Sequence, residues 1–310
     1  MTDTSPPRPR LRELLVLGSR TVWRYLGTLF SVFLVQGAIA ALCMVGVWVV
    51  LANAFSHLPL FDEAVDGDLV ALIWCLQYGR PSMLAVGAIV FAILVVWQAA
   101  SWFLAGGLYG VIAAGPEGRN DTARCFGASG ANTYLAYARL ALCALPGWAV
   151  VVFVFGIALD AALPGIENAL TIGELIGPVA LAVLPALVLV HVLWTVSDYA
   201  RVELTLRYDS HRPSAIVTYV RTIGFVLRRP ITLLHGGVGW VLFALVTTAY
   251  AYLAHGHAMY GTGGAITLFL VRQGVSLLRM AIRMAIMAGQ VRIGEQRPLP
   301  PLPIHHDQPS

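Results

Sequence analysis

Uncharged apolar stretches dominate the pattern of hydrophobic and polar residues along this chain. No side chain carries a formal charge between Arg24 and Asp62 or between Arg80 and Glu117. Three more such stretches separate Arg139 from Asp160, Glu174 from Asp198 and Arg229 from Arg272. A bilayer core of about 30 Å is crossed by roughly 20 helical residues, and a helix satisfies its own backbone hydrogen bonds there. Each stretch is therefore long enough to cross a membrane.

The last stretch is long enough to hold two helices. Its apolar pattern breaks at His255-Gly256-His257 and again at residues 261–264, where glycines favour a turn. We therefore predict an all-α, polytopic integral membrane protein with six transmembrane helices. The predicted spans are residues 28–53, 83–112, 140–160, 175–197, 231–254 and 264–288. This prediction divides the chain into a cytoplasmic amphipathic N-terminal segment (1–27), a membrane domain (28–290) and a Pro-rich disordered cytoplasmic tail (291–310).

Composition supports the membrane prediction. Hydrophobic residues make up 58% of the chain and charged residues 12%, with a mean hydropathy of +0.75, which is outside the range of soluble domains. The spans use most of the chain, so we expect no soluble catalytic domain. Zinc-protease, Walker and dinucleotide-binding motifs do not occur in the sequence, and His255 with His257 provides too few ligands for a metal. We accordingly expect no enzymatic activity and no cofactor.

Arginine residues fall mostly on one side of the six spans. That side carries Arg8, Arg10, Arg12, Arg20, Arg24, Arg119, Arg124, Arg139, Arg201, Arg207, Arg212, Arg221, Arg228, Arg229, Arg279, Arg283, Arg292 and Arg297. The loops on the other side carry Arg80 with Asp62, Glu63, Asp66, Asp68, Asp160, Glu167 and Glu174. Positively charged flanks resist translocation, so we predict that both termini are cytoplasmic. The chain has no lysine, a bias typical of a GC-rich bacterium, and we expect a multi-pass protein of the bacterial inner membrane.

The basic side also predicts the partners. Anionic headgroups of the cytoplasmic leaflet attract arginines, each of which contributes about 1 kcal/mol before salt screening. Nucleic acid is not expected, because no basic domain with interleaved aromatic residues is present to hold it. The expected partners are therefore membrane lipids with anionic headgroups and, for an accessory subunit, a second protein.

An amphipathic segment precedes each pair of spans. In the third copy one stripe consists of Ile216, Val220, Ile223 and Leu227, with Arg221, Arg228 and Arg229 opposite. The first copy places Leu11, Leu15, Val22 and Tyr25 on one face, and the weaker middle copy runs from Asp121 to Arg139. We interpret these segments as helices in the inner interface and as a repeat of architecture. The alternative is that they serve only to fix the topology.

The segment from His191 to Leu234 carries a family resemblance. Its motifs are Trp194-Thr195-Val196-Ser197-Asp198-Tyr199-Ala200-Arg201, Arg212-Pro213-Ser214-Ala215 and Val226-Leu227-Arg228-Arg229-Pro230. These motifs resemble a broad group of uncharacterised bacterial six-helix membrane proteins, whose architecture is similar to the membrane domain of some glycerophosphodiester phosphodiesterases. No phosphodiesterase catalytic domain accompanies them here. The resemblance implies a six-helix membrane architecture and a bacterial membrane location, and it supplies no catalytic residue.

Polar residues form a stripe on the sixth predicted span. Offsets of 7, 11 and 18 residues nearly complete whole helical turns. Five side chains therefore lie on one narrow arc of this helix: Arg272, Ser276, Arg279, Arg283 and Gln290. An arginine near the middle of a span costs about 2.5–3.5 kcal/mol on insertion and is expected to face protein, a cavity or water. The expected acceptors are Glu174 or Asp160 for Arg272, and Asp198 or Glu203 for Arg279 and Arg283.

The shorter sequence patterns predict contacts between helices and ion pairs within them, and none predicts a catalytic site. Asp198 with Arg201 and Glu203 with Arg207 have the spacing of helix-end ion pairs. His191 and His235 are expected to form core hydrogen bonds. The glycine-rich stretches 106–110 and 236–239 are interpreted as close-packing surfaces. Residues 127–130 match the Gly-x-Ser-Gly of rhomboid proteases only superficially, because Ser129 lies in a charged segment and the sixth span has no histidine.

Two functions are compatible with these patterns. The first is a non-catalytic membrane protein that acts in envelope organisation or as an accessory subunit. The alternative is a small permease or lipid-handling protein with an anion site near the sixth span. The candidate site residues are Arg272, Arg279, Arg283, Asp198 and Arg201. Arg272 is either a ligand for such an anion or a packing clamp between spans six and four.

Overall fold

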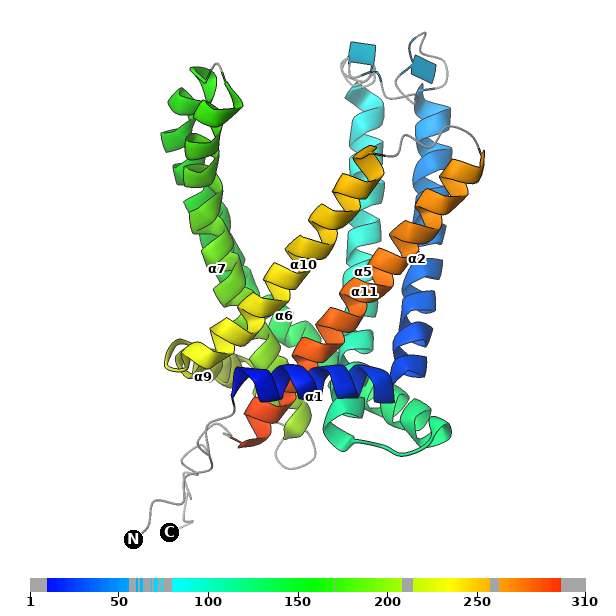
Figure 1. Ribbon diagram of the computed structural model, residues 1–310, viewed down its shortest axis with the longest axis vertical. Coiled ribbons are helices and arrows are strands. Elements are labelled where there is room, and N and C mark those ends of the chain that lie inside the picture. The colour runs from blue at the N-terminus through cyan, green and yellow to red at the C-terminus, as the bar shows by residue number, and fades with distance from the viewer. Residues whose placement is uncertain are drawn as a thin grey trace, which may run out of the picture. The chain divides into compact units, whose positions relative to one another are not determined.

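A computed structural model describes residues 10–55, 60, 62–63, 68, 70–71, 74, 80–169, 171–207, 214–256 and 262–296. No β-strand occurs among these residues (Figure 1). The helices are α1 (Leu11–Arg24), α2 (Leu26–Phe55), α5 (Arg80–Ala114), α6 (Arg119–Glu167), α7 (Ile172–Leu206), α9 (Ala215–Leu227), α10 (Pro230–Gly256) and α11 (Thr262–Gln296). Six helices of the described part, α2, α5, α6, α7, α10 and α11, are long and apolar enough to cross a membrane. The predicted all-α polytopic fold is confirmed.

The chain divides into two compact units. One unit comprises Met1–Leu29 and Ala105–Ser310, and the other comprises Phe30–Leu104. The second unit contains most of α2 and α5. The first contains α1, α6, α7, α9, α10 and α11 together with the ends of α2 and α5, and it holds all five candidate site residues.

The predicted middle interfacial segment is not a separate helix. Residues 121–139 instead form the first part of α6, which runs without interruption for 49 residues. The reason lies in one continuous stripe of buried positions: Gly130, Thr133, Tyr137, Leu140, Ala144 and Val151. This helical spacing carries the same packing surface from the polar segment into the apolar one, so nothing favours a break between them.

The predicted stripe of α9 faces away from the protein. The relative exposure of its four residues is between 38% for Ile223 and 65% for Ile216. The opposite face of α9 packs against α7 and α6 through Thr218, Tyr219, Thr222 and Phe225. Burial raises the pKa of Tyr219, so its hydroxyl stays protonated beside Ser197 of α7. An outward apolar stripe suits a helix that lies in a membrane interface.

Helix α1 packs across the end of α11 (Figure 1). Leu14 is fully buried in this contact surface, and a Cβ on Gly18 would lie 2.6 Å from the carbonyl oxygen of Ala285. Glycine is required here because the two backbones approach too closely for any side chain. Burial of Val291 and Ile293 near the same end keeps α11 helical to Gln296, beyond the predicted boundary at residue 290.

Side chains at the junction of α1 and α2 hydrogen-bond to backbone carbonyls of the turn after α5. The Arg24 guanidinium donates a hydrogen bond to the carbonyl of Gly115 at 3.0 Å, and the Tyr25 hydroxyl donates to the carbonyl of Pro116 at 3.3 Å. Burial raises the pKa of Tyr25, so this hydroxyl remains a donor. Gly115 and Gly118 have φ angles of 62° and 89°, a conformation that glycine adopts without strain.

The end of α5 packs closely against the start of α6. Added Cβ atoms on Gly106, Gly107 and Gly110 would each lie within 3.0 Å of a side-chain atom of α6. The contacted side chains are those of Thr133, Phe126 and Ser129. The interpretation of residues 106–110 as a close-packing surface is confirmed, and Ser129 serves in this contact.

Replacement of Gly110 by alanine should destabilise this contact. The new methyl group would overlap the Cβ of Ser129, which is fixed to the α6 backbone, so the two helices must separate. Overpacking of this kind costs about 1–3 kcal/mol. We expect a lower thermal unfolding temperature for Gly110→Ala in detergent, and recovery in the double variant Gly110→Ala/Ser129→Gly.

Gly224→Ala provides the control, because open space surrounds this position in α9 and alanine favours a helix. Its unfolding temperature should equal or exceed that of the unmodified protein. Equal destabilisation by both alanine substitutions would contradict the packing argument.

Candidate functional site

The carboxylate of Asp198 is the centre of a buried polar cluster. Asp198 lies on α7 with a relative exposure of 1%. Its Oδ1 accepts hydrogen bonds from Nη2 of Arg283 at 2.6 Å and from Nη1 of Arg201 at 3.3 Å. Its Oδ2 accepts a hydrogen bond from Nε2 of Gln290 at 3.1 Å. Because Arg283 and Gln290 lie on α11, the carboxylate joins α7 to α11.

Gln290 extends the cluster to α5. Its Oε1 accepts a hydrogen bond from the hydroxyl of Tyr109 at 3.0 Å, and both side chains are buried. Gln290 belongs to the predicted stripe, whereas sequence reasoning missed Tyr109. The available signal was its position as a hydroxyl-bearing residue within the glycine-rich packing stretch of an uncharged span.

Arg201 connects the cluster to α6. Its guanidinium carbon lies 5.9 Å from the ring centroid of Tyr137 on α6. The hydroxyl of Tyr137 lies 2.6 Å from Oγ1 of Thr205 and 3.2 Å from the carbonyl oxygen of Arg201. The ion pair predicted between Asp198 and Arg201 is confirmed, and so is that between Glu203 and Arg207, at 2.6 Å.

The cluster contains more positive than negative charge. Two guanidinium groups, those of Arg201 and Arg283, share the single carboxylate of Asp198. Buried charges are stable only when they are paired and hydrogen-bonded, and Asp198 meets that condition on both oxygens. One positive charge remains in excess, so the cluster can attract an anion without losing its internal pairing.

A cavity of about 160 Å³ lies beside this cluster, between α7, α10 and α11. Its polar lining includes Asp198, Arg283 and Gln290, and its aromatic lining includes Trp194, Trp240 and Phe243. The two tryptophan rings meet edge to face, with centroids 5.9 Å apart. The guanidinium carbon of Arg283 lies 5.6 Å from the ring centroid of Trp194. The lining of this one cavity therefore combines a cation with three aromatic rings.

Arg279 and Arg272 do not join the cluster. The guanidinium of Arg279 hydrogen-bonds to Oγ1 of Thr247 on α10, and Arg272 is exposed. Among the ion pairs of the described residues, none joins Arg272 to Glu174 or Asp160. The reason is geometric, because α7 and α11 approach each other at the end that carries Asp198 and diverge toward the other end (Figure 1). A clamp between these two helices exists at Arg283 instead.

The two histidines behave differently. Nε2 of His191 lies 3.1 Å from the carbonyl oxygen of Leu233, which confirms the predicted core hydrogen bond. His235 has a relative exposure of 0%, and neither ring nitrogen has a hydrogen-bond partner within the described part of the chain. The prediction of a core hydrogen bond for His235 is therefore wrong. Its ring fills the space over Gly289, where an added Cβ would lie within 3.0 Å of the ring.

No group of three or more potential metal ligands occurs among the described histidine, cysteine, aspartate and glutamate residues. The pair His255 and His257 lies outside the residues whose side chains are described. Comparison with protein-family models, curated proteins and solved structures finds no match. The resemblance of residues 191–234 to the six-helix membrane proteins therefore stays a prediction.

Loss of the Asp198 carboxylate should destabilise the bundle strongly. Asp198→Asn keeps the shape of the side chain but leaves Arg201 and Arg283 without a counter-charge in a buried position. Removing one partner of a buried ion pair costs about 3–5 kcal/mol. The exposed pair of Arg292 and Glu295 gives the control, because Glu295→Gln should cost under about 1 kcal/mol. Thermal unfolding in detergent measures both, and similar stabilities for the two variants would refute the central role of Asp198.

Proposed function

We propose that this chain is a non-catalytic, lipid-handling integral membrane protein that binds an anionic amphiphile in the cavity between α7, α10 and α11. The observation that carries this proposal is the guanidinium of Arg283, which shares the single carboxylate of Asp198 with Arg201 and lies on the wall of an aromatic-lined cavity. An anionic headgroup would lie against Arg283, and the adjoining apolar chain would lie against Trp194, Trp240 and Phe243. The described cavity lining offers no paired acid and base or activated nucleophile, which is why the proposal is binding without catalysis.

The chemistry of the lining selects the class of ligand. Asp198 already accepts three hydrogen bonds, so it would repel an anion less than an unpaired carboxylate would. Arg283 is 30% exposed at its side chain, which leaves part of the guanidinium accessible from the cavity. Guanidinium groups bind carboxylates and phosphates through paired N–H donors. A ligand with one phosphate or carboxylate and an apolar chain therefore fits this lining.

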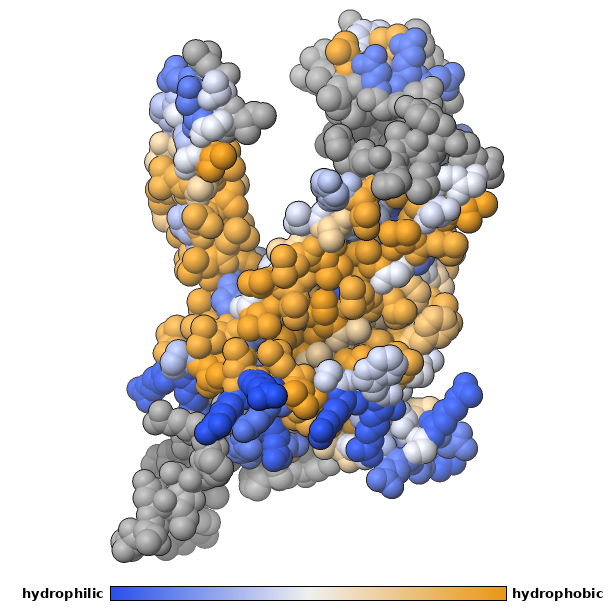
Figure 2. Space-filling view, in the orientation of Figure 1, coloured by the Kyte–Doolittle hydropathy of each residue, from blue (hydrophilic) through white to orange (hydrophobic). Residues whose placement is uncertain are grey.

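The surrounding surface would give such a ligand a route from the bilayer. On α10, Trp240, Val241 and Leu245 are exposed, and on α7 Leu187 and Val188 are exposed. The space-filling view shows an apolar surface over the middle of α10 (Figure 2). An acyl chain can remain in contact with apolar side chains while its headgroup approaches Arg283, so entry does not require passage through water.

Arg283→Gln should abolish anionic lipid binding and should destabilise the fold less than Asp198→Asn does. Glutamine can still donate a hydrogen bond to Asp198, and Arg201 and Gln290 keep their contacts with that carboxylate. Phosphatidylglycerol added to the detergent-purified protein should raise its unfolding temperature, since ligand that binds only the folded state stabilises it. The rise should be absent in Arg283→Gln, and phosphatidylcholine should produce none in either protein.

Arg139→Gln is the matched control, because Arg139 is exposed on α6 and lies outside the cavity lining. This variant should keep the full response to phosphatidylglycerol. A response that survives Arg283→Gln would refute the cavity as the lipid site. It would leave the accessory-subunit function, which is favoured by Gly156 on α6 and Gly177 on α7, two exposed glycines with open space where a partner helix could approach.

We also propose that the protein lies in the bacterial inner membrane with its arginine-rich end in the cytoplasm. In a variant without native cysteines, Glu167→Cys at the tip of the α6–α7 hairpin should react with an impermeant maleimide in intact cells. Arg124→Cys near the start of α6 should react only after the membrane is opened. Both positions are exposed, so accessibility depends on the side of the membrane alone. The reverse labelling pattern would overturn the orientation.

A further inference from the structure

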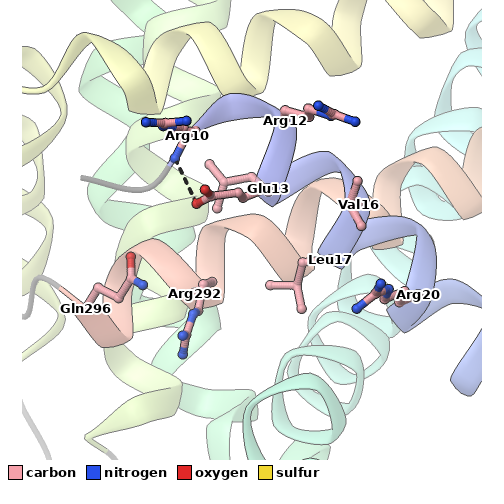
Figure 3. A pocket seen from close by; sticks show the side chains of 9 residues that line it. Arg10, Arg12, Glu13, Val16, Leu17, Arg20, Arg292 and Gln296 are labelled. Atoms are coloured by element: carbon pink, nitrogen blue, oxygen red, sulfur yellow. Dashed lines mark hydrogen bonds between the residues drawn. The ribbon is translucent and has the colours of Figure 1, made fainter. Parts of the chain in front are cut away.

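A basic groove lies between α1 and the last turns of α11. Its volume is about 520 Å³, and it is lined by Arg10, by Arg12 and Arg20 of α1, and by Arg292 and Gln296 of α11 (Figure 3). None of these residues belongs to the lining of the cavity at Asp198. The groove is therefore a second, separate feature.

The carboxylates at the groove do not balance its arginines. Glu13 is the single acidic residue of the described lining, and its carboxylate accepts a hydrogen bond from the backbone N–H of Arg10 at 3.3 Å. Arg292 lies 3.4 Å from Glu295, in an exposed ion pair that water and salt screen. Arg12 and Arg20 take part in none of the ion pairs of the described residues. The groove thus presents a net positive field to an incoming ligand.

The spacing of the arginines favours a ligand with two anionic groups. Arg12, Val16 and Arg20 follow one another at intervals of four residues along α1 (Figure 3). Eight residues correspond to about 12 Å along a helix, which is too far for one phosphate to contact both ends. Helix α11 contributes Arg292 to the lining of the same groove. Two phosphates joined by a short linker can engage the two ends together.

The neighbouring surface favours a lipid over a soluble diphosphate. Val16 lines the groove with a relative exposure of 43%, and Trp23, further along α1, has an exposure of 75%. Hydrophilic residues gather along this end of the first unit, directly below the apolar surface (Figure 2). An exposed tryptophan beside an arginine row is typical of the membrane interface, the level at which lipid phosphates lie.

We propose that the groove between α1 and α11 binds the headgroup of an anionic phospholipid that carries two phosphates. Arg12 and Arg20 contact the two phosphates from α1, and Arg292 contacts them from α11. The acyl chains leave past Val16 toward the apolar surface. Basic pockets between helices at the cytoplasmic side of a membrane are suited to such headgroups. Occupation of the groove holds α1 against α11, because the ligand neutralises arginines of both helices at once.

Binding of the full-length purified protein to nanodiscs or vesicles tests this proposal. Three compositions are compared at equal total phosphate: phosphatidylcholine alone, phosphatidylcholine with phosphatidylglycerol, and phosphatidylcholine with cardiolipin, whose headgroup carries two phosphates. Lipid retained by the protein is then counted by native mass spectrometry after release. We expect retention of cardiolipin at least about tenfold above that of phosphatidylglycerol, because only cardiolipin can bridge the two ends of the groove.

The double variant Arg20→Gln/Arg292→Gln should reduce cardiolipin retention about tenfold or more. Arg124→Gln is the matched control, since Arg124 is exposed on α6 and outside the groove, and it should retain cardiolipin within about twofold of the unmodified protein. Unfolding temperatures without lipid should agree among the three proteins, because the replaced residues are exposed or weakly paired. The double variant should keep the rise in unfolding temperature that phosphatidylglycerol produces through the cavity, because neither Arg20 nor Arg292 lines that cavity, and this separates the two sites.

Three results would overturn the proposal. Equal losses in the double variant and in Arg124→Gln would indicate a diffuse charge effect of the whole basic end. Equal retention of phosphatidylglycerol and cardiolipin would refute the requirement for two phosphates. Pyrophosphate that displaces cardiolipin completely at equimolar concentration would identify a soluble diphosphate as the ligand in place of a lipid headgroup.

Discussion

A buried carboxylate within a membrane-spanning helix is the constraint on which the rest of the first unit depends. The free-energy cost of transferring an unpaired charge into an apolar environment is far larger than the net free energy of folding of a typical domain. Asp198 is therefore tolerated only if both carboxylate oxygens accept hydrogen bonds, and Arg201 on α7 itself provides just one of the donors. Arg283 and Gln290 supply the others from α11, and Tyr109 orients Gln290 from α5. The electrostatic requirement of one residue thus fixes the register of three helices.

The cavity beside Asp198 follows from this register together with two small residues. Gly236 and Gly239 line the cavity on α10, opposite the α7 and α11 residues that form the cluster. An added Cβ on Gly236 would contact His191, and one on Gly239 would contact Ile286. The helices are therefore close enough to hold one another, while the missing side chains leave space on the side of Trp194 and Trp240. The same glycines permit both close packing and a cavity.

Much of this architecture could be predicted from the sequence, because bilayer thickness and helix geometry act on every residue in the same way. The six spans and the outward stripe of α9 depend only on periodicity. The ion pairs of Asp198 with Arg201 and of Glu203 with Arg207 depend only on local spacing within one helix. The choice of Arg283 as the clamp, in preference to Arg272, required the divergence of α7 from α11, which no local pattern encodes. The sequence marks Tyr109 only as a hydroxyl in a glycine-rich stretch, and its partner could not be assigned for the same reason, since Gln290 lies 181 residues away.

The uninterrupted α6 has a mechanical consequence. Its 49 residues correspond to about 74 Å measured along the helix axis, whereas a bilayer with its headgroups measures about 40–45 Å. One end of the helix must therefore lie along or beyond the headgroup layer, and the polar segment before Leu140 suits that position. Near the middle, Pro146 lacks the N–H that would bond to the preceding turn, which makes this the natural pivot of the helix. Phe126 and Ser129, which contact the glycines of α5, precede Pro146, and Glu167 follows it, so the part of α6 beyond the proline can tilt without disturbing the contact with α5.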